Sequence, residues 1–201
     1  MGKLIAQGAE AKIYLENNQI TKERIKKDYR LPEIDKKLRS ARTRAEARLI
    51  AKAERNGISV PQIINVDEKE NKLTLEYIDG TKLRDWLDTE TNKDEIANIC
   101  KIFGQQTRKL HDANIIHGDL TTSNVIKKES RIFFIDFGLS QVSERIEDKA
   151  VDLHLLKECF ISKHFDNHLL CWNSFEDGYK DDKVLKQLKK VEARGKYKHV
   201  G

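Results

Sequence analysis

The sequence has few cysteines and no long apolar run. Its 201 residues include three cysteines, and no two of them have the Cys-x-x-Cys spacing. An odd number of thiols without that spacing argues against a disulfide framework and fits a reducing compartment. No apolar stretch approaches the ~18 residues of a membrane helix, no apolar leader opens the chain, and Ala6 stands where a myristoylation signal needs Ser or Thr. We therefore expect a cytoplasmic protein without a membrane anchor.

The histidines and cysteines do not indicate a zinc site. His164, His168 and Cys171 lie close together in the sequence, but a fourth ligand and a recognised spacing are missing. We interpret this segment as polar surface.

Acidic and basic residues are unevenly distributed. The net charge is +5 at pH 7, and the 38% of hydrophobic residues is too high for a disordered chain. Residues 22–55 hold 13 basic and 6 acidic side chains and residues 180–201 hold 8 and 3, whereas residues 56–179 hold 15 and 22. Two basic ends flanking an acidic middle favour an anionic partner such as nucleic acid, although a solvated surface has the same composition.

The apolar periodicity divides the chain at Gly80 into a strand-rich first part and a helical second part. Before Gly80 we expect one helix over residues 35–56 and strands within residues 3–29, 62–66 and 72–78. After Gly80 we expect short extended pieces within 115–126 and 131–135, and helices over 82–87, 94–113, 148–160 and 181–192. Residues 193–201 lack apolar periodicity and are expected to fray.

The strongest chemical signal lies between residues 117 and 138. The chain reads His-Gly-Asp-Leu-Thr-Thr-Ser-Asn over 117–124 and then Asp-Phe-Gly over 136–138. This order of motifs is typical of protein-kinase-like catalytic sites. Because the transferred phosphoryl group is strongly negative, Mg²⁺ must neutralise it, and Asp136 and Asn124 offer the hard oxygen ligands that this ion prefers. Asp119 is placed to orient or deprotonate the acceptor.

The first part of the chain supplies candidates for ATP binding. The segment Gly8-Ala9-Glu10-Ala11 lies between two expected strands, where a loop that covers the phosphates belongs. Lys22, at the end of Ile-Thr-Lys, is expected to bind the α- and β-phosphates. Glu46 lies in the middle of the expected helix and is the expected ion-pair partner of Lys22.

The strand expected over 72–78 ends where a hinge between two lobes belongs. There the carbonyl of Glu76 and the amide of Ile78 would bind the adenine edge. We therefore predict an α+β fold of the minimal bilobal protein-kinase-like type, as a single domain over residues 1–201. Residues 1–78 would form an N-lobe with a small antiparallel sheet and one helix, residues 79–192 a reduced and mostly helical C-lobe, and residues 193–201 a basic tail.

The departures from the kinase pattern indicate a reduced second half. The phosphate loop has one glycine instead of three, and Glu10 would bring a negative charge near the phosphates unless it points away or gates entry. Gly118 replaces the arginine that contacts a phosphorylated activation loop, and Thr121 replaces a lysine. Only 63 residues follow Gly138, without an Ala-Pro-Glu motif. We interpret this as a phosphotransfer core that lacks most of a peptide-docking platform.

Several segments together are more specific than the kinase core alone. They are residues 8–11, 22–24, 27–32, 42–48, 117–124 and 147–153. Through them the sequence closely resembles, over essentially the whole chain, the minimal atypical kinase subunits of the KEOPS (EKC) complex, which makes threonylcarbamoyl-adenosine on transfer RNA.

The resemblance implies that the chain is more like an ATPase that serves this assembly than like a signalling kinase. It also implies weak autophosphorylation. It implies that the C-lobe binds the threonylcarbamoyl transferase subunit and that the N-lobe binds a small activator subunit. It also implies ATP and Mg²⁺ as cofactors and tRNA as a partner of the basic tail. Arg194, Lys196 and Lys198 match that tail approximately.

Two other functions remain open at this point. The chain could be a non-catalytic, nucleotide-bound adaptor for tRNA and the transferase subunit, which the basic segments favour. It could also be a small-molecule kinase, since those enzymes share the His-Gly-Asp motif, but the 63 residues after Gly138 hardly supply the helical acceptor pocket.

A few residues outside these motifs are expected to support the site. We expect His117 to organise the catalytic loop through a buried hydrogen bond, and Asp152 to brace the backbone of that loop. Trp86 and Trp172 are expected to be packing anchors.

Overall fold

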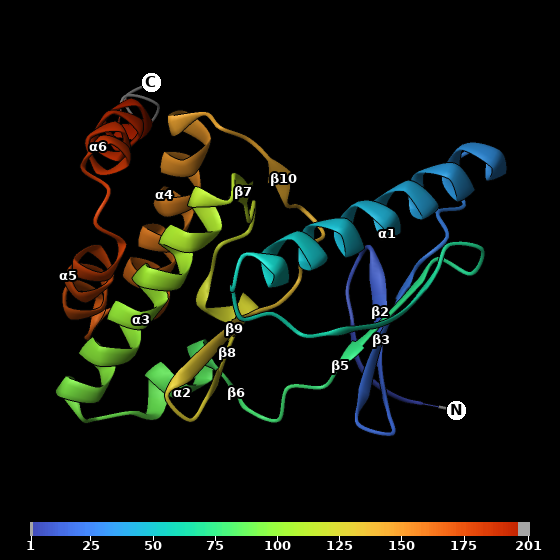
Figure 1. The fold of residues 1–201 in the computed structure, drawn as a ribbon, viewed down its shortest axis with the longest axis horizontal. Coiled ribbons are helices and arrows are strands. Elements are labelled where there is room, and N and C mark those ends of the chain that lie inside the picture. The colour runs from blue at the N-terminus through green and yellow to red at the C-terminus, as the bar shows by residue number, and fades with distance from the viewer. Residues whose placement is uncertain (1, 197–201) are drawn as a thin grey trace.

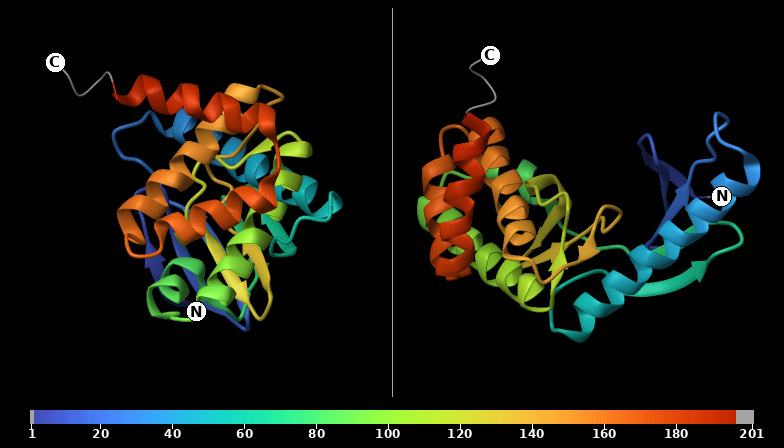
Figure 2. Two further views of the ribbon diagram at one scale, coloured as in Figure 1. Left: turned by 90° about the vertical axis from the view of Figure 1, so that its left-hand side faces the viewer. Right: turned by 90° about the horizontal axis from the view of Figure 1, so that it is seen from above.

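A strand-rich N-terminal lobe and a mostly helical C-terminal lobe make up the computed structural model, which describes residues 2–196 (Figure 1). Figure 2 shows the two lobes side by side, with the last helices of the chain at the end far from the N-terminal sheet. The α+β bilobal fold is therefore confirmed.

The N-lobe consists of one antiparallel sheet and one long helix, α1 (Pro32–Arg55). The sheet order is β1 (Lys3–Gln7), β2 (Ala11–Glu16), β3 (Gln19–Arg24), β5 (Lys72–Glu76) and β4 (Ile63–Asp67). Asn17 and Asn18 turn the β2–β3 hairpin with φ of 49° and 61°, the left-handed conformation that such turns need. The hairpin fixes the register that pairs Ile13 with Lys22.

One side of α1 is buried and carries the apolar residues Ala47, Leu49, Ile50 and Ala53 together with Glu46. Pro32 opens the helix, because its fixed φ suits the first turn and its missing N–H is not needed there. The buried side of α1 contacts β4 and β5. The helix therefore presents the carboxylate of Glu46 to the interior, where it needs a cationic partner.

Up to Lys196, the C-lobe is built from five helices around short strands. The helices are α2 (Leu83–Thr89), α3 (Lys93–Asp112), α4 (Ile146–Lys163), α5 (His168–Tyr179) and α6 (Asp182–Lys196). The strands are β6 (Thr81–Lys82), β8 (Val125–Lys128) and β9 (Arg131–Phe134), which form one sheet, and the pair β7 (Ile115–Ile116) and β10 (Gln141–Val142). A short 3₁₀ turn, η1 (Thr122–Asn124), lies between β7 and β8.

The C-lobe core is centred on α3. Phe103 of α3 packs against Phe134 and Phe175, with ring centroids 5.9 and 5.3 Å apart. Two glycines let α3 and α5 approach closely, since a Cβ at Gly104 would lie 2.1 Å from the Phe175 carbonyl and one at Gly178 would lie 2.0 Å from the Lys101 carbonyl. Both helices therefore pack backbone against backbone.

Most expected elements are found within three or four residues of the predicted bounds. The last helix is an exception, because α6 continues past Glu192 to Lys196. Arg194 pairs with Glu147 of α4 at 2.5 Å and so ties this extra turn to the C-lobe. Trp172 is buried, and Trp86 is partly buried beneath the ammonium group of Lys127.

The interpretation of residues 164–171 as polar surface is wrong. His164 and Cys171 are buried, and His168 begins helix α5, which was not predicted. The signal was present, because Cys171, Trp172, Phe175 and Tyr179 have the spacing of one helical face. Within residues 2–196 no cluster of His, Cys, Asp and Glu has the arrangement of a metal site, and no helix is long and apolar enough to cross a membrane.

The close approach of α3 and α5 makes a stability prediction. A methyl group at position 178 must push the backbone of α3 away, so Gly178→Ala should destabilise the fold by about 2–3 kcal/mol. Gly8→Ala is the matched control, since a Cβ there meets nothing within 4 Å, and its effect should stay within about 0.5 kcal/mol. Urea unfolding measures both, and equal stabilities of the two variants would contradict the packing argument.

Candidate active site

Lys22 of β3 lies at the centre of an ion-pair group that joins the two lobes. Its Nζ donates to Oε1 of Glu46 on α1 and to Oδ1 of Asp136 after β9, each at 2.7 Å. Burial lowers the pKa of Lys22, but the two carboxylates outweigh burial and the pKa lies above its ordinary value. Lys22 is therefore a fixed positive charge held between both lobes.

Glu46 shares its carboxylate between two cations. Oε1 accepts from Lys22, and Oε2 accepts from Nη2 of Arg24 at 2.5 Å. Arg24 and Glu46 are both buried, and a buried charge is tolerated only when it is paired and hydrogen-bonded. Arg24 was not predicted, although it follows Lys22 by two residues in a strand and so lies on the same face.

Asp136 has a left-handed backbone, with φ of 62°. Its Oδ1 accepts from Lys22 and also from the amide of Gly138 at 3.2 Å. Burial raises the pKa of the Asp136 carboxyl, but Lys22 and the Gly138 amide outweigh burial and hold the pKa below its ordinary value. The side chain is therefore an anion at neutral pH.

Asp119 and Asn124 form a second pair in the catalytic loop (residues 117–124). Nδ2 of Asn124 donates to the Asp119 carbonyl at 2.9 Å and to Oδ2 of Asp119 at 2.7 Å. The amide of Ile135 donates to the Asn124 carbonyl at 2.9 Å, which places Asn124 against the residue before Asp136. Thr122 of η1 is hydrogen-bonded to His164 at 2.9 Å, so the buried end of α4 supports this turn.

These residues fit a hard cation. Within residues 2–196, Oδ1 of Asn124 and Oδ2 of Asp136 have no hydrogen-bond donor, whereas their other polar side-chain atoms are engaged. An amide oxygen and a carboxylate oxygen are ligands that Mg²⁺ prefers. Lys22 neutralises part of the Asp136 charge through their ion pair.

Hydrogen bonds to α4 and to Ile135 fix the backbone and the histidine of the catalytic loop. The amides of His117 and Gly118 donate to the two oxygens of Asp152 on α4, at 2.7 and 2.9 Å. Nε2 of His117 is hydrogen-bonded to the Ile135 carbonyl at 3.2 Å. Both supporting contacts have the form expected from the sequence.

Gly118 has no room for a side chain. Its φ is 78°, and a Cβ would lie 2.3 Å from the carbonyl of Leu139. The segment after Asp136 therefore contacts the position where protein kinases have an arginine. This contact gives a steric reason for the His-Gly-Asp sequence.

The segment Gly8-Ala9-Glu10-Ala11, which was predicted to cover the phosphates, is tied to neighbouring segments and is not glycine-rich. Nζ of Lys27 donates to the Ala9 carbonyl, and the amide of Ile25 donates to the Glu10 carbonyl at 3.0 Å. Oε2 of Glu10 accepts from Nη1 of Arg42 on α1 at 2.7 Å. The charge of Glu10 is therefore compensated by α1, and Lys27 and Arg42 are loop-holding residues that were not predicted.

The other predicted site residues lie in different surroundings. At the hinge, the carboxylate of Glu76 accepts from the Gln62 amide at 3.2 Å, and Ile78 is buried with a backbone amide that has no acceptor within residues 2–196. Arg194 lies on α6, Lys196 is its last residue, and Lys198 lies outside the described residues.

The lowered pKa of Asp136 makes a prediction for stability against pH. A carboxylate with a lowered pKa stabilises the folded state above its unfolded pKa, and this contribution is lost as pH falls through the folded pKa. The wild-type chain should therefore be more stable than Asp136→Asn at pH 7, and the difference should shrink below pH ~4. Asparagine tolerates the same left-handed backbone, so the variant isolates the charge.

Urea unfolding of both proteins at pH 7, 5 and 3.5 measures this difference. Asp166→Asn, at an exposed acid, is the control and should show no such change. A wild-type advantage that stays constant down to pH 3.5 would contradict the role given to Lys22.

Comparison with known proteins places the chain in a family. A profile of the RIO domain matches residues 11–169. The chain is 42% identical to the KEOPS complex subunit Bud32 of Pyrococcus abyssi, over 98% of this chain and 96% of that protein. It is also 42% identical to a probable bifunctional tRNA threonylcarbamoyladenosine biosynthesis protein of Methanococcus maripaludis, over 96% of this chain but 36% of that longer protein.

Solved structures show the same fold at low sequence identity. The Rio2 kinase of Chaetomium thermophilum, solved with ADP, Mg²⁺ and phosphoaspartate, has a TM-score of 0.64 and 14% identity, over 98% of this chain and 71% of that one. An ADP-bound aminoglycoside phosphotransferase has a TM-score of 0.67 and 12% identity, over 96% and 82%. The chain thus belongs to the RIO-domain family of kinase-like proteins and, within it, to the group of the KEOPS subunit Bud32.

Proposed function

We propose that the chain is a Mg²⁺-dependent ATPase and atypical serine/threonine kinase that serves the KEOPS complex in the threonylcarbamoyl-adenosine modification of tRNA. The observation that carries the proposal is the meeting of Glu46 and Asp136 at the ammonium group of Lys22, next to the Asp119–Asn124 pair. The relatives named above support the cellular setting.

Each side chain has one task in this reaction. Lys22 would exchange the Asp136 carboxylate for oxygens of the α- and β-phosphates, while Glu46 and Arg24 keep the lysine extended. Asp119, held by the Asn124 amide, would orient a water or hydroxyl group and accept its proton. Mg²⁺, held by Asp136 and Asn124, would neutralise the charge that develops on the phosphoryl group.

The remaining predicted residues would bind the rest of ATP. The free amide of Ile78 and the carbonyl of Glu76 would bind the adenine edge. The segment Gly8-Ala9-Glu10-Ala11 would cover the phosphates, with its backbone fixed by Lys27 and Arg42.

Exposed apolar side chains support a partner on each lobe. On the N-lobe, four of them lie at the start of α1 and just before it: Tyr29, Leu31, Ile34 and Leu38. On the C-lobe, four lie on α4: Ile146, Val151, Leu155 and Ile161. Groups of exposed apolar residues mark interaction sites, so we propose the activator subunit for the first and the transferase subunit for the second.

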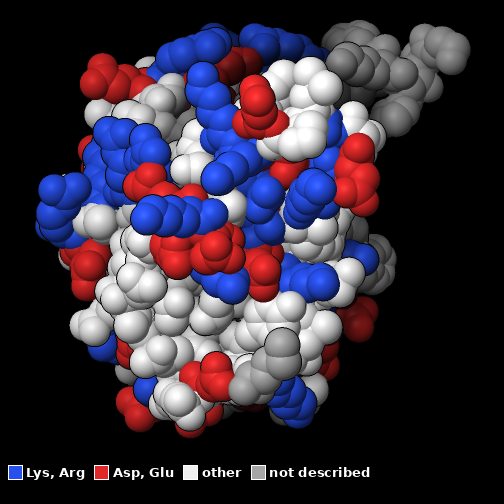
Figure 3. Space-filling view, turned by 90° about the vertical axis from the view of Figure 1, so that its right-hand side faces the viewer, with Lys and Arg blue, Asp and Glu red and all other residues white. Residues whose placement is uncertain are grey.

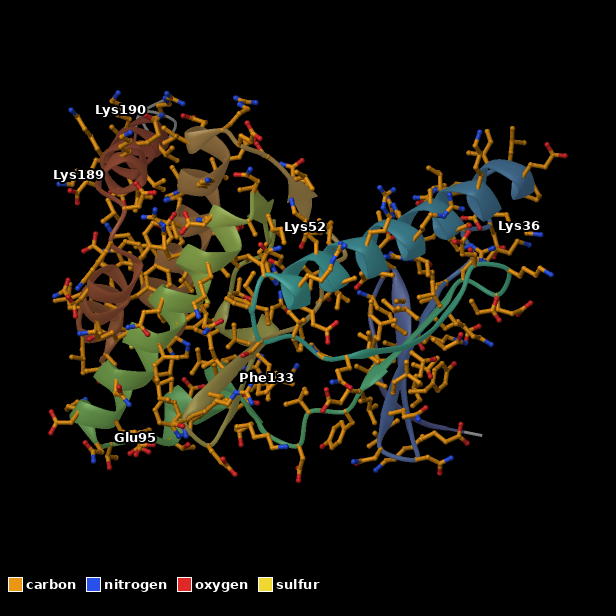
Figure 4. The ribbon with its side chains drawn as sticks, viewed as in Figure 1. Lys36, Lys52, Glu95, Phe133, Lys189 and Lys190 are labelled. Atoms are coloured by element: carbon orange, nitrogen blue, oxygen red, sulfur yellow. The ribbon has the colours of Figure 1, made fainter. Side chains whose placement is uncertain are left out.

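Basic helices support tRNA as a further partner. Lys183, Lys186, Lys189 and Lys190 of α6 are exposed and have no ion-pair partner within residues 2–196. Figure 4 shows Lys189 and Lys190 pointing away from the C-lobe. Together with Arg194, and with Lys196 and Lys198 near the end of the chain, they would bind RNA phosphates.

The adaptor function stays as the second candidate because α1 is also basic. Lys36, Lys37 and Arg48 are exposed without an ion pair within the described residues. Figure 3 shows lysine and arginine side chains, mixed with acidic ones, over the upper half of the N-lobe face. An adaptor would bind tRNA and ATP through these groups without turnover.

ATP turnover distinguishes the two functions. With γ-labelled ATP and Mg²⁺, the chain should release labelled phosphate, and Asp136→Ala should reduce release at least 100-fold, because the cation loses its carboxylate ligand. Release should rise when the tRNA-bound transferase partner is added. Label that stays on protein would favour the kinase reaction.

The control is Asp166→Ala, which removes an exposed carboxylate between α4 and α5 of the C-lobe and should turn over normally. Circular dichroism should give the same spectrum for both variants. If Asp136→Ala released phosphate at the wild-type rate, the assigned site would be excluded. If neither the wild-type chain nor the variants released phosphate, the adaptor function would be favoured.

The salt dependence of tRNA binding tests the α6 surface. Each phosphate contact adds about 0.7–0.9 to the slope of log affinity against log salt, so Lys189→Ala/Lys190→Ala should reduce the slope by about 1.4–1.8. Lys36→Ala/Lys37→Ala is the matched pair on α1. A reduced slope for the α1 pair alone would move the RNA surface to the N-lobe.

A further inference from the structure

A chain of buried polar side chains runs from α5 to the catalytic loop. The Tyr179 hydroxyl of α5 is hydrogen-bonded to Nδ1 of His111 on α3 at 2.7 Å. Nε2 of His111 contacts Oδ2 of Asp152 at 3.2 Å. That same oxygen accepts from the amide of His117, and the other oxygen accepts from Gly118. Tyr179, His111 and Asp152 are each at most 1% exposed.

The direction of these hydrogen bonds follows from the groups present. The Asp152 carboxylate only accepts, so Nε2 of His111 must carry a proton in order to bond to it. In the singly protonated imidazole, Nδ1 has a lone pair, which accepts from the Tyr179 hydroxyl. Burial raises the pKa of the Tyr179 phenol, so that this donor keeps its proton.

We propose that Tyr179 is a positioning residue of the active site, which acts by holding His111 in the tautomer that donates to Asp152. Without the hydroxyl group, Nδ1 of the singly protonated imidazole would be a buried acceptor with no donor, and in the other neutral tautomer, with the proton on Nδ1, Nε2 is unprotonated. Two lone pairs would then face each other at the His111–Asp152 contact. Asp152 would hold the amides of His117 and Gly118 less firmly, and with them the backbone next to Asp119.

The surroundings of Tyr179 separate the hydroxyl group from the packing of its ring. The ring is stacked on Phe175 at 6.0 Å and lies edge-on to His111 at 5.5 Å. Tyr179→Phe keeps both ring contacts and removes only the donor. Thermal unfolding should therefore change by a few degrees at most, so that effects on the catalytic loop can be assigned to the hydrogen bond.

The direct test is the tautomer of His111, measured from the ¹⁵N chemical shifts of its ring in the full chain. Wild-type protein should carry the proton on Nε2, and Tyr179→Phe should populate the Nδ1 form. Hydrogen exchange at the amides of His117 and Gly118 should become at least 10-fold faster. Tyr14→Phe, at a partly exposed tyrosine of β2 in the N-lobe, should change neither quantity.

The kinetic consequence rests on the proposed ATPase activity. Tyr179→Phe should lower kcat for phosphate release about 10-fold and leave KM for ATP within 2-fold, because the lesion lies in the catalytic loop and not in the nucleotide contacts. If the wild-type chain has no turnover, the proposed function fails, while the tautomer and exchange measurements still decide the role of Tyr179.

A second variant keeps the test valid if Tyr179→Phe does not fold. His111→Gln places an amide, which has a fixed donor and a fixed acceptor, between Tyr179 and Asp152. Amide exchange at His117 and Gly118 should stay within 3-fold of wild type, whereas His111→Leu should lose protection. An unchanged His111 tautomer in Tyr179→Phe, or unchanged exchange in His111→Leu, would overturn the proposal.

Discussion

The arrangement of the two lobes depends on the ion pairs that the ammonium group of Lys22 makes with two carboxylates. Its two carboxylate partners come from α1 of the N-lobe and from the segment after β9 of the C-lobe. A partly buried lysine keeps its charge only when carboxylates lie next to it. The sheet, the long helix and the Asp-Phe-Gly segment must therefore meet at one point. The β2–β3 hairpin and the buried face of α1 are the local structures that bring the two N-lobe groups there.

The C-lobe provides a rigid platform for the opposite side of this site. Asp152 fixes the catalytic loop through its backbone amides, and Gly118 allows the segment after Asp136 to pass directly above that loop. Behind them, α3 and α5 pack closely through Gly104 and Gly178 and carry His111 and Tyr179. The proposed catalytic groups thus depend on the core of the lobe, whereas the loop proposed to cover the phosphates depends on the exposed Glu10–Arg42 ion pair.

Much of this arrangement could be predicted from the sequence, because motifs of fixed spacing carry it. Periodicity predicts the strands around Lys22 and the helix with Glu46. The loop with Asp119 and Asn124 follows from a combination of residue types that is typical of phosphoryl transfer. Tertiary partners could not be predicted in the same way. In the sequence, Arg24, Arg42 and Tyr179 cannot be told from ordinary strand or helix residues, because their partners are distant in the chain. Helix α5 was not predicted because polar residues lie between the apolar residues of its buried face.

The most direct test of the central claim is the affinity of the chain for ATP with and without Mg²⁺, measured by calorimetry. If Lys22, Asn124 and Asp136 form a site for the metal–nucleotide complex, Mg²⁺ should strengthen ATP binding at least 10-fold, and Asp136→Asn should abolish that gain. Equal affinities with and without Mg²⁺ in the wild-type chain would contradict the account.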